Sequence, residues 1–189
     1  MNYYEITGVV FGLACVWLTT RQSIWNWPLG IVNVSAFIVM FYNAKLYPDM
    51  WLHIVYLLMG IYGWVKWGMG SINWGEPKVK LPVTRVNSGE LYAWITAVPI
   101  SVIAMGHFFD NNTDAVAPYV DSTITVISLI ANYLLCRKIL ENWILWMIVD
   151  VIAVSLYTYK GLYLTAGLYV VYFILCVIGY KKWKKELQA

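Results

Sequence analysis

Residues 137–151 read RKILENWILWMIVDV, and residues 21–35 read RQSIWNWPLGIVNVS. Both stretches carry Arg, Asn, Trp and Leu in the same order and spacing. The similarity continues without gaps over residues 21–67 and 137–183, at a constant offset of 116. Twelve of these 47 aligned positions are identical, including an arginine, an asparagine and two tryptophans, which apolar composition alone would rarely align. The chain therefore contains an internal duplication.

The composition around this duplication is that of a membrane protein. Of 189 residues, 61% are hydrophobic and only 12% are charged, whereas a soluble domain carries about 25% charged residues. Seven apolar stretches have helical length: 3–20, 28–44, 51–67, 91–109, 119–136, 143–160 and 163–180. We therefore expect an all-α integral membrane protein with seven transmembrane helices.

The duplication divides this single membrane domain, residues 1–189, into three parts. Repeat 1 covers residues 3–67 and repeat 2 covers residues 119–183. Between them, residues 68–118 hold a charged, Gly/Pro-rich loop and an unpaired linker helix at 91–109. Each repeat has three helices, and one linker helix returns the chain to its starting side. The expected architecture is thus 3+1+3, with two parallel repeats.

The basic residues indicate how the chain crosses the membrane. Eleven of the thirteen Lys and Arg residues fall on the side of the C-terminus, and two fall on the other side. The positive-inside rule then places the C-terminus in the cytoplasm and the N-terminus outside. The first ten residues lack the basic start of a cleavable signal, so we expect them to begin the first span. The net charge of +3 reflects this topology, and no nucleic-acid partner is expected.

Three of the expected helices carry polar or aromatic stripes. At 100° per residue, Trp143, Trp146 and Asp150 fall within about 60° of one another. The three stripes are Asp121, Thr125, Ser128 and Asn132; Trp143, Trp146, Asp150 and Tyr157; and His53, Tyr56, Gly60, Gly63 and Trp67. Polar groups at membrane depth are costly unless they face a cavity or one another. We expect the stripes to share a pocket, and its indoles and carboxylate suit a planar cation.

Other interpretations apply to some of these residues. Trp67 and Trp183 precede basic residues at span ends, which favours an interfacial aromatic belt, and Trp27 also lies near a span end. Trp143 fits a belt or a pocket equally well. The three cysteines, Cys15, Cys136 and Cys176, are expected to be packing residues. No nucleotide-binding or zinc motif occurs, so no cofactor and no metal are expected.

Three segments resemble the PnuC family of vitamin transporters: IWNWPLGIVNV (24–34), KLYPDMWLHIVYLLMGIYGW (45–64) and RKILENWILWMIVDV (137–151). This resemblance covers both repeats. It implies seven helices in 3+1+3 order, similar to SWEET sugar transporters, and a homotrimer in the bacterial inner membrane. It also implies uptake of nicotinamide riboside by facilitated diffusion, followed by trapping through cytoplasmic phosphorylation.

By the same resemblance, Trp143 and Trp146 are the indoles of the family motif, Asn142 precedes them, and Asn33 matches an asparagine of the second helix. Two positions depart from the family pattern: His53 replaces a glutamine and Asp150 replaces an asparagine. Thiamine, another planar cationic vitamin, therefore stays open as the substrate. The candidate substrate-binding residues are Asn33, His53, Tyr56, Ser128, Asn132, Asn142, Trp143, Trp146, Asp150, Tyr157 and Tyr172.

Two other classes of function, a membrane enzyme and a scaffold, fit the sequence less well. A membrane enzyme would use His53 and Asp150 as acid and base, but no nucleophile, metal set or phosphate cradle accompanies them. A scaffold without transport activity would not require the polar stripes. The expected activity is transport, and no enzymatic activity is expected.

Overall fold

The computed structural model describes residues 3–43, 45, 47–69, 80–113 and 117–188. Within these residues the chain forms seven helices and no named strand. They are α1 (Tyr3–Thr20), α2 (Asn26–Asn43), α3 (Tyr47–Met69), α4 (Ser88–Asn112), α5 (Pro118–Cys136), α6 (Asn142–Tyr159) and α7 (Tyr163–Leu187). Each helix covers one of the predicted spans, so the all-α fold with seven helices is confirmed.

The helices differ in how apolar they are. Among the described helices, α4, α5, α6 and α7 are long and apolar enough to cross a membrane. The sequences of α2 and α3 have comparable lengths, but they include asparagine, tryptophan, tyrosine and histidine, which lower their mean hydropathy. Polar residues inside such helices normally face the interior of the bundle.

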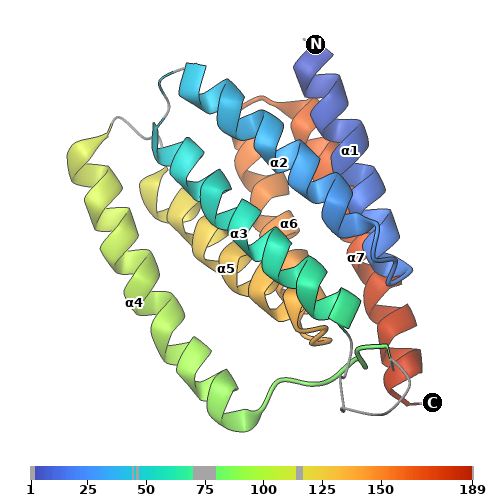
Figure 1. Ribbon diagram of the computed structural model, residues 1–189. Coiled ribbons are helices and arrows are strands. Elements are labelled where there is room, and N and C mark those ends of the chain that lie inside the picture. The colour runs from blue at the N-terminus through green and yellow to red at the C-terminus, as the bar shows by residue number, and fades with distance from the viewer. Residues whose placement is uncertain (1–2, 44, 46, 70–79, 114–116, 189) are drawn as a thin grey trace.

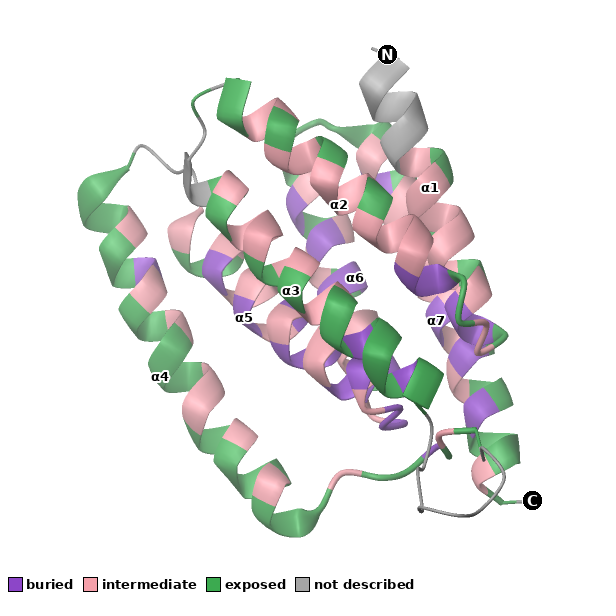
Figure 2. Ribbon diagram, viewed as in Figure 1, coloured by how far each residue is buried: buried purple, intermediate pink, exposed green. Residues whose placement is uncertain are grey.

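Six of the helices form a closed ring. Going round the ring, α1 contacts α2, α2 contacts α3, α3 contacts α5, α5 contacts α6, α6 contacts α7, and α7 returns to α1. The remaining helix, α4, lies outside the ring and packs on α5 (Figure 1). Gly106 permits this close packing, because an added Cβ would lie 2.4 Å from the ring of Tyr119. Most of the rest of α4 is exposed (Figure 2).

The turns after α1 and α5 have the same backbone geometry. In the first, the amides of Gln22 and Ser23 donate to the carbonyls of Thr19 and Leu18, at 2.9 and 3.0 Å. Such a pair of bonds closes a helix with one residue in the left-handed conformation, and Gln22 has φ 53°.

The second turn repeats this pattern 116 residues later. The amides of Lys138 and Ile139 donate to the carbonyls of Leu135 and Leu134, at 3.0 and 2.9 Å, and Lys138 has φ 54°. The two left-handed residues also bond to each other, because Lys138 Nζ donates to Gln22 Oε1 at 3.0 Å. The turns thus join the ends of α1 and α5 at one end of the ring.

The chain before α4 fastens this end of the molecule. The Thr84 amide donates to the Lys138 carbonyl at 3.1 Å, and the Leu140 amide donates to the Thr84 carbonyl at 2.8 Å. Lys138 Nζ also donates to the Leu81 carbonyl at 3.0 Å. Burial lowers the pKa of the Lys138 ammonium. The segment from Leu81 to Thr84 therefore holds the connection between α5 and α6 in place.

Candidate functional site

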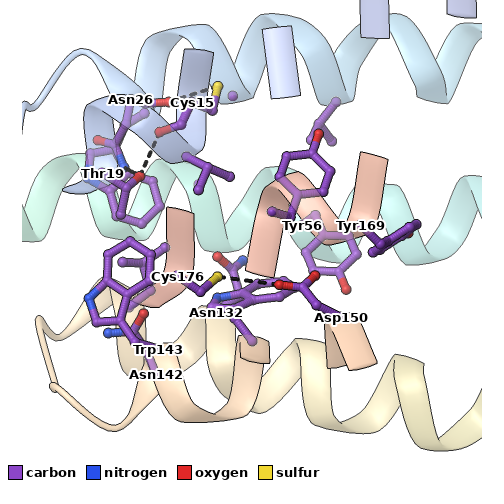
Figure 3. A pocket seen from close by; sticks show the side chains of 18 residues that line it. Cys15, Thr19, Asn26, Tyr56, Asn132, Asn142, Trp143, Asp150, Tyr169 and Cys176 are labelled. Carbon is purple, nitrogen blue, oxygen red and sulfur yellow. Dashed lines mark hydrogen bonds between the residues drawn. The ribbon is translucent and has the colours of Figure 1, made fainter. Parts of the chain in front are cut away.

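A cavity of about 330 Å³ lies inside the ring of six helices, and every one of them contributes to its lining. Figure 3 shows how the labelled side chains converge on it from these helices. The polar, sulfur-containing and aromatic lining residues are Cys15, Thr19, Asn26, Trp27, Tyr56, Asn132, Asn142, Trp143, Trp146, Asp150, Tyr169, Tyr172 and Cys176. This volume is at the lower end of the range for small-molecule sites, about 300–1,000 Å³.

Four buried tryptophans close the basic end of the cavity, and we call Trp27, Trp67, Trp143 and Trp183 the tryptophan floor. Trp27 and Trp143 line the cavity and belong with the other two to one hydrophobic cluster. Trp27 meets Trp67 edge to face at 5.3 Å between ring centroids, and Trp143 meets Trp183 in the same way at 5.4 Å. Trp67 and Trp183 lie 6.0 Å apart, so the floor is continuous.

Two glycines make room for this floor. A Cβ added at Gly63 would lie 2.3 Å from the Trp27 ring, and one added at Gly179 would lie 2.5 Å from the Trp143 ring. Hydrogen bonds fix the two remaining indoles. Trp67 Nε1 donates to the Leu135 carbonyl, and Trp183 Nε1 donates to the Thr19 carbonyl at 3.2 Å.

Unpaired polar atoms gather where the floor meets the cavity. Asn26 and Asn142 are 5% and 0% exposed, and their amide nitrogens donate to Thr19 and to the Ile139 carbonyl. Their Oδ1 atoms have no hydrogen-bond partner among the described residues, and neither do the Nε1 atoms of Trp27 and Trp143. Buried polar groups are rarely left unpaired in folded proteins. Two acceptors and two donors are therefore available beside the cavity.

Asp150 places one carboxylate in the middle of α6, against the cavity. Its side chain is 3% exposed, and its partner is Cys176, whose Sγ donates to Oδ2 at 3.5 Å. No lysine or arginine among the described residues forms an ion pair with it. An isolated buried carboxylate is costly. A positively charged ligand in the cavity would supply the missing partner.

Aromatic rings line the same cavity as this carboxylate. Tyr56, Tyr169, Tyr172 and Trp146 all line the cavity that Asp150 lines, and Figure 3 shows the Tyr56, Tyr169 and Asp150 side chains in it. Tyr169 and Tyr172 meet edge to face, with 5.9 Å between ring centroids. The faces of aromatic rings attract cations, and more strongly where water is excluded. The cavity thus combines one carboxylate with several π faces.

Seven of the eleven candidate residues from the sequence line this cavity. They are Tyr56, Asn132, Asn142, Trp143, Trp146, Asp150 and Tyr172. Trp143, Trp146 and Asp150 lie on one face of α6 within two helical turns, so these three predicted side chains form one wall of the cavity. The stripe on α5 contributes Asn132 to the lining, and the stripe on α3 contributes Tyr56 and Gly60.

The other four candidates do not line the cavity. Tyr157 lies behind it, because its ring stacks on Tyr169 with 5.3 Å between centroids. Ser128 is buried next to Tyr56. His53 sits among aromatic rings at 4.8–6.1 Å and bonds the Asp49 carbonyl at 2.8 Å. Asn33 is half-buried on α2, between cavity-lining Gly30 and Val34 in sequence.

Sequence reasoning missed several lining residues. Trp27 looked like part of an aromatic belt, and Cys15 and Cys176 looked like ordinary packing residues. The duplication contained the signal for Asn26 and Trp27, because at the offset of 116 they match Asn142 and Trp143. A residue that repeats a candidate site residue in the other half of the chain is itself a site candidate.

The belt interpretation of Trp67 and Trp183 is wrong. Their side chains are 8% and 0% exposed, and both belong to the tryptophan floor. Belt tryptophans contact lipid headgroups and water. These two indoles instead bond backbone carbonyls inside the protein, because Gly63 and Gly179 leave space for the floor one turn earlier on the same helices.

The lining itself is arranged in pairs separated by 116 residues. Sixteen of its eighteen residues form such pairs. They are Val16/Asn132, Thr19/Leu135, Asn26/Asn142, Trp27/Trp143, Gly30/Trp146, Val34/Asp150, Tyr56/Tyr172 and Gly60/Cys176. The cavity therefore receives corresponding positions from the two halves of the chain. Among the described residues, no group of three His, Cys, Asp or Glu side chains is arranged to hold a metal ion.

Comparison with known proteins gives this cavity a family context. A family model described as nicotinamide mononucleotide transporter matches residues 2–185. The chain belongs to this family. It is 28% identical to the nicotinamide riboside transporter PnuC of Escherichia coli (strain K12), over 97% of this chain and 85% of that protein. It is 27% identical to PnuC of Neisseria mucosa, over 97% of this chain and 73% of that protein. The resemblance to PnuC proteins is confirmed.

One relative is named for a different substrate. The riboflavin/roseoflavin transporter RibM of Streptomyces davaonensis is 27% identical over 95% of this chain and 83% of its own length. Among solved structures, the crystal structure of the vitamin B3 transporter PnuC matches with a TM-score of 0.75 and 23% identity, over 98% of this chain and 82% of that one. The chain therefore has the fold of a PnuC transporter and is a bacterial membrane protein of a transporter family.

Proposed function

We propose that this protein takes up nicotinamide riboside across the bacterial inner membrane. The observation that carries the proposal is Asp150, a buried carboxylate without a described cationic partner in a cavity walled by aromatic rings. The nicotinamide ring of the riboside is flat and positively charged. Its ring suits the π faces, and its charge compensates Asp150.

The polar end of the cavity fits the rest of such a ligand. The unpaired Oδ1 atoms of Asn26 and Asn142 accept hydrogen bonds, and the indole nitrogens of Trp27 and Trp143 donate them. A carboxamide and ribose hydroxyls offer both kinds of partner. The substrate names of two relatives point the same way, since the PnuC proteins of Escherichia coli and Neisseria mucosa are nicotinamide riboside transporters.

Thiamine is the alternative substrate. It is also a planar cationic vitamin, and Asp150 favours any cation of suitable size. Riboflavin, the substrate named for the Streptomyces davaonensis relative, has a neutral ring system and leaves Asp150 uncompensated. The carboxylate therefore favours the two cationic vitamins over riboflavin.

The proposed transport mode is facilitated diffusion, with the product trapped by phosphorylation in the cytoplasm.

The proposed architecture has two parallel three-helix repeats, residues 3–67 and 119–183, joined by the linker helix in a 3+1+3 arrangement similar to SWEET transporters. The ring supports it, because exchanging corresponding helices of the two halves (α1 with α5, α2 with α6, α3 with α7) turns the α1–α2, α2–α3 and α1–α7 contacts into the α5–α6, α6–α7 and α5–α3 contacts. The proposed assembly is a homotrimer in the bilayer, as the resemblance to PnuC proteins implies.

A binding titration tests the proposal. Purified protein is titrated with nicotinamide riboside and with thiamine, and binding is followed by calorimetry. We expect saturable binding of the riboside with higher affinity than thiamine. Tight thiamine binding without riboside binding would reverse the order of the two substrates. Binding of neither vitamin would overturn the assignment of a cationic vitamin to this cavity.

A further inference from the structure

Three of the eight pairs that line the cavity differ in the same direction. At three related positions the first half of the chain has Gly30, Val34 and Val16, while the second half has Trp146, Asp150 and Asn132. At these three positions, the groups suited to ring stacking, charge and hydrogen bonding come from the second half. At the same places the first half supplies small or apolar side chains. The two halves have related positions but different contributions to the site.

Gly30 is the extreme case of this difference. A Cβ added there would meet nothing within 4 Å. By contrast, Gly63 and Gly179 are required by the indoles packed against them, as an added Cβ would overlap the rings. Glycine inside a helix lowers helix stability relative to alanine, and no packing contact requires a glycine at position 30. Gly30 lines the cavity, so the space that it leaves belongs to the cavity.

Gly30 and Trp146 occupy opposite walls. In the ring of six helices, α2 stands between α1 and α3, and α6 stands between α5 and α7, which puts α2 and α6 on opposite sides. A flat ring that stacks on Trp146 therefore extends its other face toward α2. The absence of a side chain at position 30 provides thickness for that ring.

We infer that Gly30 is a specificity-determining residue of the cavity. The ligand ring stacks on Trp146, and Gly30 on the facing helix sets the width of the slot that receives it. This inference rests on the proposed function for the identity of the ring. A larger side chain at position 30 narrows the slot. It should lower the binding affinity most for ligands that carry bulky ring systems.

The test compares two glycines that differ in their position relative to the cavity. Gly30 is the fifth residue of α2, and Gly167 is the fifth residue of α7. Gly167 is exposed, does not line the cavity, and also leaves open space for an added Cβ. The variants Gly30→Ala, Gly30→Leu, Gly167→Ala and Gly167→Leu form a matched set. Each is examined for thermal unfolding and for its dissociation constant for nicotinamide riboside.

We expect Gly30→Ala to bind more weakly than the parent, and Gly30→Leu to bind about tenfold more weakly or worse, because the side chain occupies ligand volume. Gly30→Ala should melt at or above the parent temperature, because it adds a helix-favouring residue and its Cβ meets open space. The Gly167 variants should bind like the parent. Parent-like binding by Gly30→Leu would overturn the inference.

A second measurement does not depend on the identity of the vitamin. Cys15 and Cys176 line the same cavity, and peptide mapping after thiol labelling reports each of them separately. Gly30→Leu should slow their labelling by an aromatic maleimide more than by small methyl methanethiosulfonate, whereas Gly167→Leu should change neither rate. If the parent binds neither vitamin but this difference appears, the proposed substrate fails and the slot stands. Equal labelling rates in the parent and in Gly30→Leu would overturn the inference that Gly30 sets the width of the slot.

Discussion

At the scale of single residues, the two indoles of α6 have different surroundings. Trp143 is 2% exposed and packs against Gly179 and Trp183, whereas Trp146 is half-buried at the edge of the same cluster. Both line the cavity. The sequence predicts both as candidate pocket residues, because their angular positions on a helix are close. Only the packing around them separates an indole that belongs to the core from one that is available to a ligand.

Substitution of these indoles is expected to separate binding from stability. Trp146→Ala should weaken substrate binding by ~1–2 kcal/mol, the scale of a desolvated cation over a ring, and Trp146→Phe should cost less. Trp143→Ala should weaken binding and also lower unfolding stability by ~3–5 kcal/mol, since it leaves a large hole in the floor. Calorimetric titration and thermal unfolding measure the two effects. Trp183→Ala, which removes a floor residue outside the lining, should affect mainly stability. If it alone weakened binding, the α6 indoles would be packing residues.

Asp150→Asn keeps the shape of the side chain and removes its charge. We expect lower affinity for nicotinamide riboside and thiamine, because the buried negative charge no longer attracts the cation. The dihydro form of nicotinamide riboside has an uncharged ring, and its affinity should change little. Titration of parent and variant with both forms gives the comparison. An equal loss for charged and uncharged forms would mean that Asp150 acts through shape or hydrogen bonding.

At the scale of helices, apolar composition predicted the elements well and their ends less well. The first span was expected at 3–20 and α1 covers Tyr3–Thr20, but the stretch 91–109 became α4, Ser88–Asn112. The prediction stopped where hydrophobic residues stopped. Helices continue into polar residues that cap them, as Asn87 does by accepting a bond from the Gly89 amide at 3.1 Å. The sequence does not predict which helix packs against each face, because periodicity identifies a face but not the element that covers it.

The contact between glycine and tryptophan is the feature of α3 and α7 most open to test. Gly63→Ala and Gly179→Ala each place a Cβ 2.3–2.5 Å from an indole of the tryptophan floor. Because the floor is closely packed, we expect each to lower unfolding stability by ~1–3 kcal/mol. Thermal unfolding in detergent measures this, with Gly167→Ala on α7 as the control, where an added Cβ meets open space. Parent-like melting of both variants would show that the floor adjusts freely.

At the scale of the whole molecule, the distribution of basic residues predicts the orientation in the membrane. Eleven of thirteen basic residues lie on the C-terminal side in the seven-span topology. A reporter fused after Ala189 should therefore read cytoplasmic, and one fused at Met1 should read external. A pair of reporters active on opposite sides, such as an alkaline phosphatase and a fluorescent protein, makes the measurement. Both ends on one side would exclude seven spans. The tryptophan floor lies at the basic end, so this result also assigns the floor to the cytoplasmic side.

The charge inside the bundle determines the expected energetics of transport. Among residues whose exposure the structure describes, Asp150 is the one buried carboxylate, so no second described acid accompanies it to form a proton relay or a sodium site. If the substrate cation itself compensates Asp150, no co-transported ion is needed. Uptake of nicotinamide riboside into proteoliposomes should then reach the outside concentration and stop, with or without a sodium or proton gradient. Radiolabelled substrate measures the plateau, and liposomes without protein give the background.

Accumulation above the outside concentration under either gradient would contradict facilitated diffusion. Accumulation only when a riboside kinase and ATP are enclosed would agree with trapping, because phosphorylation removes the transported species from the equilibrium.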